Sequence, residues 1–403
     1  MVGLLGIAVL LGIAFALSSA KRSISFRTVG GAFAMQALIG AFVLYSELGK
    51  EVLLAATGFV ANIIAYSQDG IDFLFGPIGD KSIAFIFAFN VLPVIVFFSS
   101  LIAVLYHLKV MGLIIKVIGG FLQKVLRTSR PESMSAAANI FVGQTEAPLV
   151  VRPFIPHMTR SELFAVMVGG LASIAGSVMA GYAGMGVDLK YLLAASFMAA
   201  PGGMLMAKII LPETEEPKDG LSEIDSEDTG YANVFDAAAS GAASGMTLAL
   251  NVGAMLLAFI ALIAMFNGLV GWTGGLLGYE NVTFEGIMGY ILQPLAWAIG
   301  VPWEEAQIAG SFIGQKMVVN EFVAYLNYLE HQPNLSESTQ AIVTFALCGF
   351  ANLSSIAILM GGIGAMAPTR RKEIAQLGLK AVIAATLSNL MSAALAGIYL
   401  TLG

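Results

Sequence analysis

The chain has little charge and almost no cysteine. Charged residues make up only 11% of its 403 residues, whereas an average soluble domain carries about 25%. A single cysteine, Cys348, excludes an intramolecular disulfide and a cysteine cluster for a metal ion. The three histidines, His107, His157 and His331, are scattered, and none has zinc-like spacing to another ligand.

The chain consists largely of long apolar runs with few charged residues. Hydrophobic residues make up 58% of the chain, and a membrane-spanning helix needs about 20 mostly apolar residues. The apolar and polar residues do not alternate in ten-residue segments, which excludes an outer-membrane barrel. We therefore predict an all-α polytopic membrane protein with eight transmembrane helices. The eight runs are residues 2–20, 28–46, 84–106, 163–187, 191–207, 237–279, 338–369 and 381–403.

Lysine and arginine predict how the chain is oriented. Lys21 and Arg22 follow the first apolar run instead of preceding it, so this run is interpreted as a retained span and not as a signal peptide. Eight spans with both termini outside place 16 of the 20 basic residues in or next to the cytoplasm. The reverse orientation would invert this bias. The segment 212–236 becomes a cytoplasmic loop; its acidic part, 212–230, is typical of a flexible linker, with a regulatory role as the alternative.

Four pairs of segments repeat in the same order. The offsets between the two copies are 174, 175, 179 and 190 residues. Each copy begins with a span, continues with a segment expected to lie in the membrane interface and a segment too short to cross twice, and ends with two spans. The alternative for the second interfacial segment is a short span with Pro294 in it. Three spans separate the two short segments, so these re-entrant hairpins enter from opposite faces and the repeats are inverted, as in many secondary transporters. The segments are the interfacial helices 112–126 and 286–300 and the hairpins 130–155 and 301–330.

Polar residues gather where each hairpin is expected to turn. An ionised carboxylate at the centre of a span costs about 2.5–3.5 kcal/mol on insertion scales, so Glu146 and Glu321 must bind something polar or make a needed contact. Gln144 and Thr145 beside Glu146 add amide and hydroxyl groups, and "FANLSS" adds Asn352, Ser354 and Ser355. Since no arginine lies among them, an anionic ligand is disfavoured. The set suits a neutral, hydroxyl-rich molecule such as a sugar or nucleoside.

A cation site is a further hypothesis. Asn139 and Ser173 offer side-chain oxygens, and the glycines at 169, 170 and 176 make local unwinding plausible. The alternatives are structural: a serine in a membrane helix often bonds its own backbone, Gln144 and Thr145 can cap a helix, and Glu146 can pair with a neighbouring donor.

The strings "GQTEAPLVVRPF", "NEFVAY" and "CGFANLSSIAI" resemble the concentrative nucleoside transporters, most strongly the bacterial sodium-coupled members. The resemblance covers essentially the whole chain. It implies that three groups of residues contact the substrate: Gln144, Thr145 and Glu146 on the nucleobase, Glu321, Asn352 and Ser355 on the ribose, and Val178 and Phe350 against the base. It implies a sodium site made by Asn139, Val142, Ser173 and Ile174.

The same resemblance implies a homotrimer in the bacterial cytoplasmic membrane that moves a transport domain as an elevator. Residues 1–107 would be mostly scaffold, with an interfacial segment at 51–66, and the sixth span 237–279 would complete it. The two repeats, 108–211 and 280–403, would form the transport domain. Sodium would be the coupling ion, with no other cofactor and no nucleic-acid partner, and uridine is a representative substrate.

Three alternatives remain open at this stage. Proton-coupled members of the family tend to lack the asparagine that corresponds to Asn139, so its presence favours sodium. An intramembrane hydrolase would use Glu146 and Glu321 as a carboxylate pair about 5–10 Å apart. A channel is the third alternative, and the inverted repeats and the substrate-sized set of polar residues disfavour it. A transporter, and not an enzyme, is the prediction.

Overall fold

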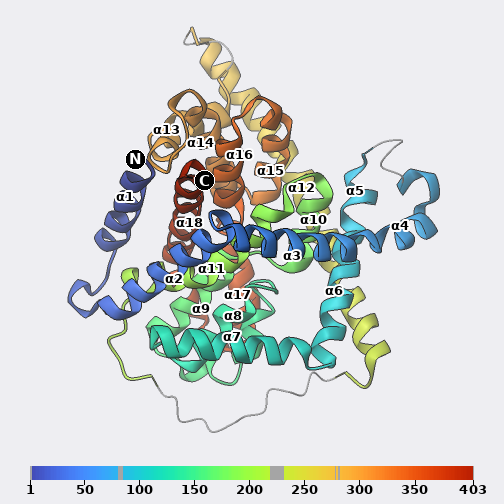
Figure 1. Cartoon of the computed structure of the whole chain (residues 1–403). Helices are drawn as coiled ribbons and strands as arrows, with labels where there is room; N and C mark the ends of the chain where they lie inside the picture. Colours follow the sequence, from blue (N-terminus) through green and yellow to red (C-terminus); the bar gives the residue numbers. More distant parts are fainter. Residues whose placement is uncertain (1, 80–84, 218–230, 277, 280–281, 403) are drawn as a thin grey trace.

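The computed structural model describes residues 2–79, 85–217, 231–276, 278–279 and 282–402 (Figure 1). Every regular element in these ranges is a helix. The α-helices are α1 (Val2–Ala16), α2 (Phe26–Leu44), α3 (Glu47–Ala65), α4 (Ser67–Phe75), α5 (Phe87–Asn90), α6 (Leu92–His107), α7 (Val110–Leu126), α8 (Arg130–Ala138), α9 (Arg160–Ala172), α10 (Gly176–Met185), α11 (Leu189–Ile210), α12 (Val234–Leu276), α13 (Phe284–Ala298), α14 (Trp303–Val318), α15 (Glu321–His331), α16 (Glu337–Leu347), α17 (Ser354–Met366) and α18 (Arg371–Leu402).

Within the described ranges, seven helices are long and apolar enough to cross a membrane, or eight if the bent pair α13 and α14 counts as one. This agrees with the predicted class of fold, but the set differs from the eight predicted runs. Helix α1 has 15 residues, about 22 Å of helix, which is short of a bilayer core of about 30 Å. Residues 47–79 are long and apolar enough by the same criteria, so the interfacial placement of 51–66 stays a prediction.

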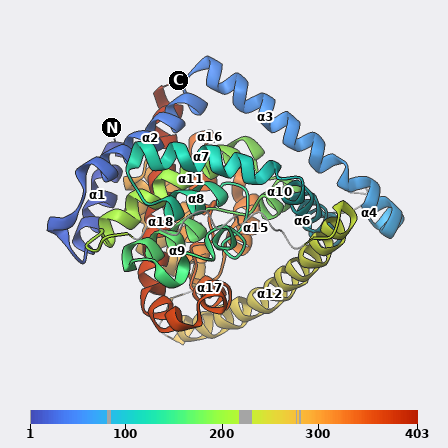
Figure 2. The same ribbon diagram turned by 90° about the horizontal axis from the view of Figure 1, so that it is seen from below.

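The helices divide into a buried centre and an exposed periphery. Figure 2 shows α8, α9, α11 and α18 inside, while α3 and α12 run along two sides of the outline. In their most apolar windows, the α9–α10 segment is 100% buried and the 47–79 segment only 11% buried. Helix α12 has 43 residues, about 65 Å, so it must tilt or extend beyond a bilayer. It packs against α6 at one end.

Both segments predicted as hairpins turn back on themselves, with different second limbs, and their re-entry from one face of the membrane stays a prediction. In the first hairpin, α8 enters and the chain returns through short 3₁₀ turns, η3 (Ala147–Val151) and η4 (Ile155–His157). Pro148 lies in the first turn of η3, where its missing N–H costs no helical hydrogen bond. The second hairpin has two α-helical limbs, α14 and α15, joined at Val319 and Asn320.

Two predicted spans are broken in the middle. The fourth span divides at residues 173–175, between α9 and α10, as the neighbouring glycines indicated; we call these residues the first break. The seventh span was predicted as one run over 338–369. It divides at residues 348–353, between α16 and α17, which we call the second break. The apolar composition of this run hid the interruption.

Two stretches that the topology places in or next to the cytoplasm are partly structured. Residues 370–380 are helical, because α18 begins at Arg371. In the segment 212–236, residues 218–230 lie outside the described residues, and α12 begins at Val234. Glu213 is not free, because its carboxylate accepts a hydrogen bond of 2.8 Å from Thr159 Oγ1. The start of this linker is therefore bound to the helical body.

The turns that lead into the two hairpins differ. Helix α7 ends at Arg127, which has a φ of 52°, an uncommon conformation for a residue with a side chain. Helices α13 and α14 are bent by 117° relative to each other, and Gly300 between them has a φ of 114°. Only glycine adopts such a φ without strain, so this turn depends on residue 300.

Candidate functional site

The two breaks lie side by side at the centre of the molecule. The backbone N–H of Phe350 in the second break donates to the Ser173 carbonyl in the first break at 3.2 Å. Each break also bonds its own hairpin: Gly176 N donates to Phe141 O at 2.8 Å, and Leu353 N donates to Met317 O at 3.1 Å. The two hairpins and the two broken spans thus form one connected unit.

Glu321 is a buried carboxylate of this unit with a hydrogen-bond donor on each oxygen. It is the first residue of α15, directly after the helix cap Asn320, and is only 4% exposed. Its Oε1 accepts from Tyr182 Oη at 3.0 Å and its Oε2 accepts from Asn352 Nδ2 at 2.9 Å. Asn352 Oδ1 in turn accepts from the backbone N–H of Ser355 at 2.9 Å. The predicted ribose set of Glu321, Asn352 and Ser355 is therefore one hydrogen-bonded cluster.

The tip of the first hairpin reaches this cluster through Gln144. Its Nε2 donates to Ser355 Oγ at 3.3 Å, across 211 residues of sequence. The close approach needs Gly170 in α9, where a Cβ would lie 3.0 Å from the Cβ of Gln144. Thr145 faces α17, because its Cγ2 is 3.0 Å from where Gly362 would carry a Cβ. Glu146, in contrast, is exposed.

The two residues predicted to lie against the base, Val178 and Phe350, are positioned by different breaks. Val178 follows the first break by three residues and is 2% exposed in α10. Phe350 is half-buried within the second break. The structure therefore brings Gln144, Glu321, Asn352 and Ser355 into one cluster, with Phe350 adjacent through the backbone. No ligand is present, so contact of Val178, Phe350, Thr145 and Glu146 with a base stays a prediction.

The four residues predicted for sodium are all buried next to the first break. Asn139 caps the end of α8, and its Nδ2 donates to Ser135 O at 2.9 Å. That nitrogen lies 3.1 Å from where Gly169 would carry a Cβ, and Ser173 Oγ donates to the Gly169 carbonyl at 3.1 Å. The serine thus bonds its own backbone, as the structural alternative anticipated, and its oxygen still has acceptor capacity. Val142 and Ile174 are 4% and 0% exposed.

One oxygen in this group lacks a partner. Asn139 is 1% exposed, and its Oδ1 has no hydrogen-bond donor among the described residues. A buried polar atom without a partner is destabilising and calls for a bound water or ion. A carbonyl-type oxygen of this kind is a ligand that hard cations accept.

Three residues of the site were not predicted from the sequence. Tyr182 donates to Glu321, and its ring packs against those of Phe322 and Tyr325, with centroids 4.6 and 4.7 Å apart. Tyr182 follows Val178 by four residues in α10, and residues four apart lie on the same face of a helix. This spacing could have indicated from the sequence that Tyr182 faces the predicted substrate site. Lys316 Nζ donates to Asn389 Oδ1 at 2.7 Å, and Asn389 Nδ2 donates to Cys348 O in the second break at 2.9 Å. Neither residue gave a signal in the sequence, because α14 and α18 are distant in sequence from the breaks.

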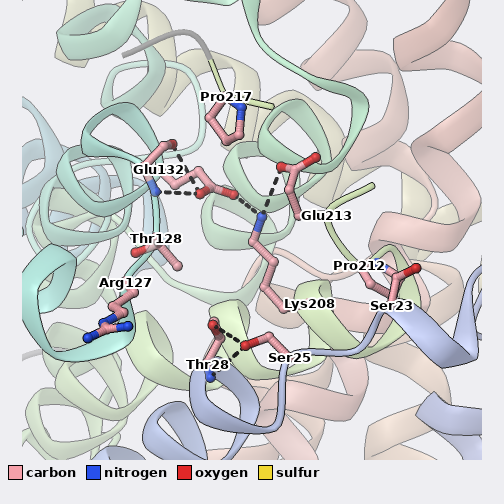
Figure 3. A pocket seen from close by; sticks show the side chains of 11 residues that line it. Ser23, Ser25, Thr28, Arg127, Thr128, Glu132, Lys208, Pro212, Glu213 and Pro217 are labelled. Carbon is pink, nitrogen blue, oxygen red and sulfur yellow. Dashed lines mark hydrogen bonds and ion pairs between the residues drawn. The ribbon is translucent and has the colours of Figure 1, made fainter. Parts of the chain in front are cut away.

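A separate polar cavity of about 120 Å³ lies at the base of the first hairpin (Figure 3). It opens between the start of α2, the turn into α8 and the end of α11. Lys208 pairs there with Glu132 and lies 3.7 Å from Glu213, and its Nζ donates to Ser161 Oγ at 2.9 Å. Glu132 lies in the first turn of α8, whereas Asn139 caps its other end, so this cavity is distinct from the cluster around Glu321. Its ion pairs join α8, α11 and the linker.

Buried broken helices around a polar cluster are typical of secondary transporters, and comparison with known proteins identifies the family. Three family models cover most of the chain: "Na+ dependent nucleoside transporter N-terminus" at residues 5–78, "Nucleoside recognition" at residues 88–188, and "Na+ dependent nucleoside transporter C-terminus" at residues 191–397. The chain belongs to the concentrative, Na+-dependent nucleoside transporter family. Its members are transporters and not enzymes, so the hydrolase alternative is withdrawn.

Several relatives match this chain over nearly their whole length. The "Nucleoside permease NupC" of Helicobacter pylori is 51% identical, over 98% of this chain and 97% of its own. The solved structure of CNTnw in an inward-facing, substrate-bound state is 58% identical with a TM-score of 0.96, and covers 100% of this chain and 99% of that one. A variant of CNTnw in an outward-facing state is 57% identical with a TM-score of 0.97, over 100% of this chain and 98% of that one.

Proposed function

We propose that this protein imports nucleosides into the cell by sodium-coupled symport. The observation that carries the proposal is the bond between the two breaks. Ser173 belongs to the predicted sodium set, and its carbonyl accepts from the N–H of Phe350, which belongs to the predicted substrate set. An ion that orders the first break would therefore also order the second break, where the nucleoside would bind. This gives the coupling a physical location.

The polar cluster suits a nucleoside. Ribose hydroxyls donate well to a carboxylate, and Glu321 is buried with its charge held by two donors. Gln144 supplies an amide that both donates and accepts, as a nucleobase edge requires. A bound ribose would replace or share the present bonds of Asn352 and Ser355. Uridine is the probe that we choose.

The predicted sodium ligands supply oxygens only. The unpartnered Oδ1 of Asn139 would coordinate the ion directly, together with the Ser173 hydroxyl and the carbonyls of Val142 and Ile174. One cation crossing the membrane yields about 2.3 kcal/mol per 100 mV. At about 1.4 kcal/mol per tenfold, this alone supports roughly 50-fold accumulation of a neutral substrate.

Movement would follow the division into centre and periphery. The two repeats, residues 108–211 and 280–403, would move as one transport domain against a scaffold of the N-terminal helices and α12. Solved relatives in inward- and outward-facing states support such alternation. A homotrimer would cover part of the exposed apolar surface of the scaffold, where Leu257 and Leu54 are 78% and 61% exposed. Both termini would lie on the outer side of the bacterial cytoplasmic membrane.

The test is uptake of labelled uridine by proteoliposomes that contain the purified protein. We expect an inward sodium gradient to drive uptake that saturates and concentrates intact uridine. Uptake driven by a proton gradient without sodium would contradict sodium coupling and support the proton-coupled alternative. Linear uptake that never exceeds the outside concentration would indicate a channel and contradict the symport proposal.

A further inference from the structure

A tyrosine of the first repeat holds the carboxylate that is predicted for the ribose in the second repeat. Tyr182 lies in α10, the helix that follows the first break, and its Oη donates to Glu321 Oε1 at 3.0 Å across 139 residues of sequence. The two residues are 0% and 4% exposed. A hydrogen bond to an ionised group is roughly twice as strong as one between neutral groups. The ribose acceptor of one repeat is therefore held by a donor of the other.

The ring of Tyr182 is fixed against the helix that carries its acceptor. Its centroid lies 4.6 Å from that of Phe322 and 4.7 Å from that of Tyr325. Both of these residues belong to α15, which begins with Glu321. A buried ring between two others cannot change its rotamer without opening the packing around it. The phenol oxygen is therefore held in one place relative to the carboxylate.

The bonds to Glu321 leave part of its acceptor capacity open. A carboxylate offers about four lone-pair sites on its two oxygens. Tyr182 bonds one oxygen, and Asn352 Nδ2 bonds the other at 2.9 Å. Both oxygens can still accept a further donor, and a ribose presents two, its 2′ and 3′ hydroxyl groups. The direction of these open sites is set by the two protein donors, because they fix the plane of the carboxylate.

We propose that Tyr182 is a positioning residue that orients Glu321 for the ribose and thereby sets how strongly the protein prefers ribonucleosides to deoxynucleosides. The inference rests on the proposed function and deepens it. Tyr182 acts through the carboxylate of Glu321 and not on the nucleoside. An acceptor that is already oriented loses less entropy when the ribose binds. Since Tyr182 and Glu321 come from different repeats, the ribose acceptor is in position only when the first broken span is docked on the second hairpin.

The same aromatic cluster supplies a matched control. Tyr325 is also 0% exposed, and its Oη donates to the carbonyl of Thr344 in α16 at 2.9 Å. Tyr182→Phe and Tyr325→Phe therefore each remove one buried hydroxyl group and keep the ring. The first leaves a carboxylate with one donor fewer, and the second leaves a backbone carbonyl with one donor fewer. A difference between the two variants isolates the bond to Glu321.

The experiment measures equilibrium binding of labelled uridine to the purified full chain in sodium, with 2′-deoxyuridine and 3′-deoxyuridine as competitors. In Tyr182→Phe we expect the Kd for uridine to rise about tenfold, because a hydrogen bond to a charged group is lost. The Kd of the deoxyuridine that lacks the hydroxyl bound by Glu321 should change much less, so its ratio to that of uridine narrows. In Tyr325→Phe we expect a lower midpoint of thermal unfolding and an unchanged ratio.

A double variant tests whether Tyr182 acts through Glu321. Glu321→Gln alone should already narrow the ratio, and Tyr182→Phe added to it should change uridine affinity little further, because the two residues share one interaction. Independent effects that multiply would overturn the proposal. If Tyr182→Phe does not fold with its carboxylate short of a donor, the double variant has no charge to leave unpaired, and its comparison with Glu321→Gln still decides.

Two further outcomes would contradict the role of Tyr182. One is a ratio in Tyr182→Phe equal to that of the unaltered protein. The other is a ratio that narrows as much in Tyr325→Phe, which is the behaviour of a merely structural hydroxyl. Failure of the unaltered protein to bind uridine in sodium would instead contradict the proposed function, so the two failures are distinguished before any variant is compared.

Discussion

The two repeats have the same architecture and different chemistry. Each has a hairpin bonded to a broken span, through Phe141 and Gly176 in the first and Met317 and Leu353 in the second. In the second, the carboxylate of Glu321 and the ammonium group of Lys316 are already bonded within the protein. In the first, the Oδ1 of Asn139 has no described partner. The second repeat also has a buried atom without a described partner, Gln315 Nε2, so the difference lies in the groups beside the breaks: bonded charged groups in the second repeat and an unpartnered amide oxygen in the first.

The largest effect is expected at the carboxylate of the second repeat. Glu321→Gln removes the charge to which Tyr182 and Asn352 donate. Hydrogen bonds to charged groups contribute about 1.5–3 kcal/mol each, so uridine affinity should fall roughly 10- to 100-fold. Equilibrium binding of labelled uridine to the purified protein measures this. The exposed Glu330→Gln on the same helix is the control, and equal affinity for both variants would remove Glu321 from the site.

A smaller effect is expected at the open position of the first repeat. Asn139→Ala removes the unpartnered Oδ1 while it leaves Glu321 and its donors intact. The sodium concentration for half-maximal uptake should rise on the order of tenfold, the equivalent of about 1.4 kcal/mol, with little change in thermal stability. Asn334→Ala, at an exposed position, is the matched control. If Asn139→Ala kept the normal sodium requirement, the first repeat would not be the ion site.

The smallest effect on transport is expected at the turns that lead into the hairpins, where a substitution changes the stability of the fold. The first repeat tolerates Arg127 at a φ of 52°, whereas the second uses Gly300 at a φ of 114°. Gly300→Ala should destabilise the fold by about 1–3 kcal/mol, seen as a lower midpoint of thermal unfolding in detergent. Gly12→Ala in α1 meets open space and should be neutral or stabilising. Equal midpoints for the two variants would mean that the α13–α14 turn adapts to a side chain.

Much of the fold could be predicted because lipid imposes a simple rule. Charge-free runs of about 20 residues mark spans, and this indicated α2, α11 and α12 within a few residues. The same rule failed where a helix ends inside protein. The run 338–369 has no charged residue, and the second break shows in its sequence only as small and polar residues. Helix α18 begins ten residues before its apolar run, because a helix continues into water without a change of structure.

The residues of the site also divide into those that could be predicted from the sequence and those that could not. Glu321, Asn352, Ser355 and Gln144 could be selected because polar groups are costly at membrane depth, and the structure joins them in one cluster. Roles that depend on an ion or nucleoside, including those of Val142, Ile174, Val178, Thr145 and Glu146, stay predictions. Tyr182 was within reach of sequence analysis by its helical spacing from Val178. Lys316 was counted only as a basic residue on the outer side of the topology.

The sequence by itself determined that this protein is a helical membrane protein with two inverted repeats, because hydrophobic length and repeat order are properties of the chain. Only the tertiary structure decided where helices stop within the interior and which buried groups meet there. Those contacts join residues up to 217 positions apart, as between Asn389 and Ala172, and no local pattern encodes such a pairing. The difference between a bonded ammonium group in one repeat and an unpartnered oxygen in the other is therefore visible only after folding.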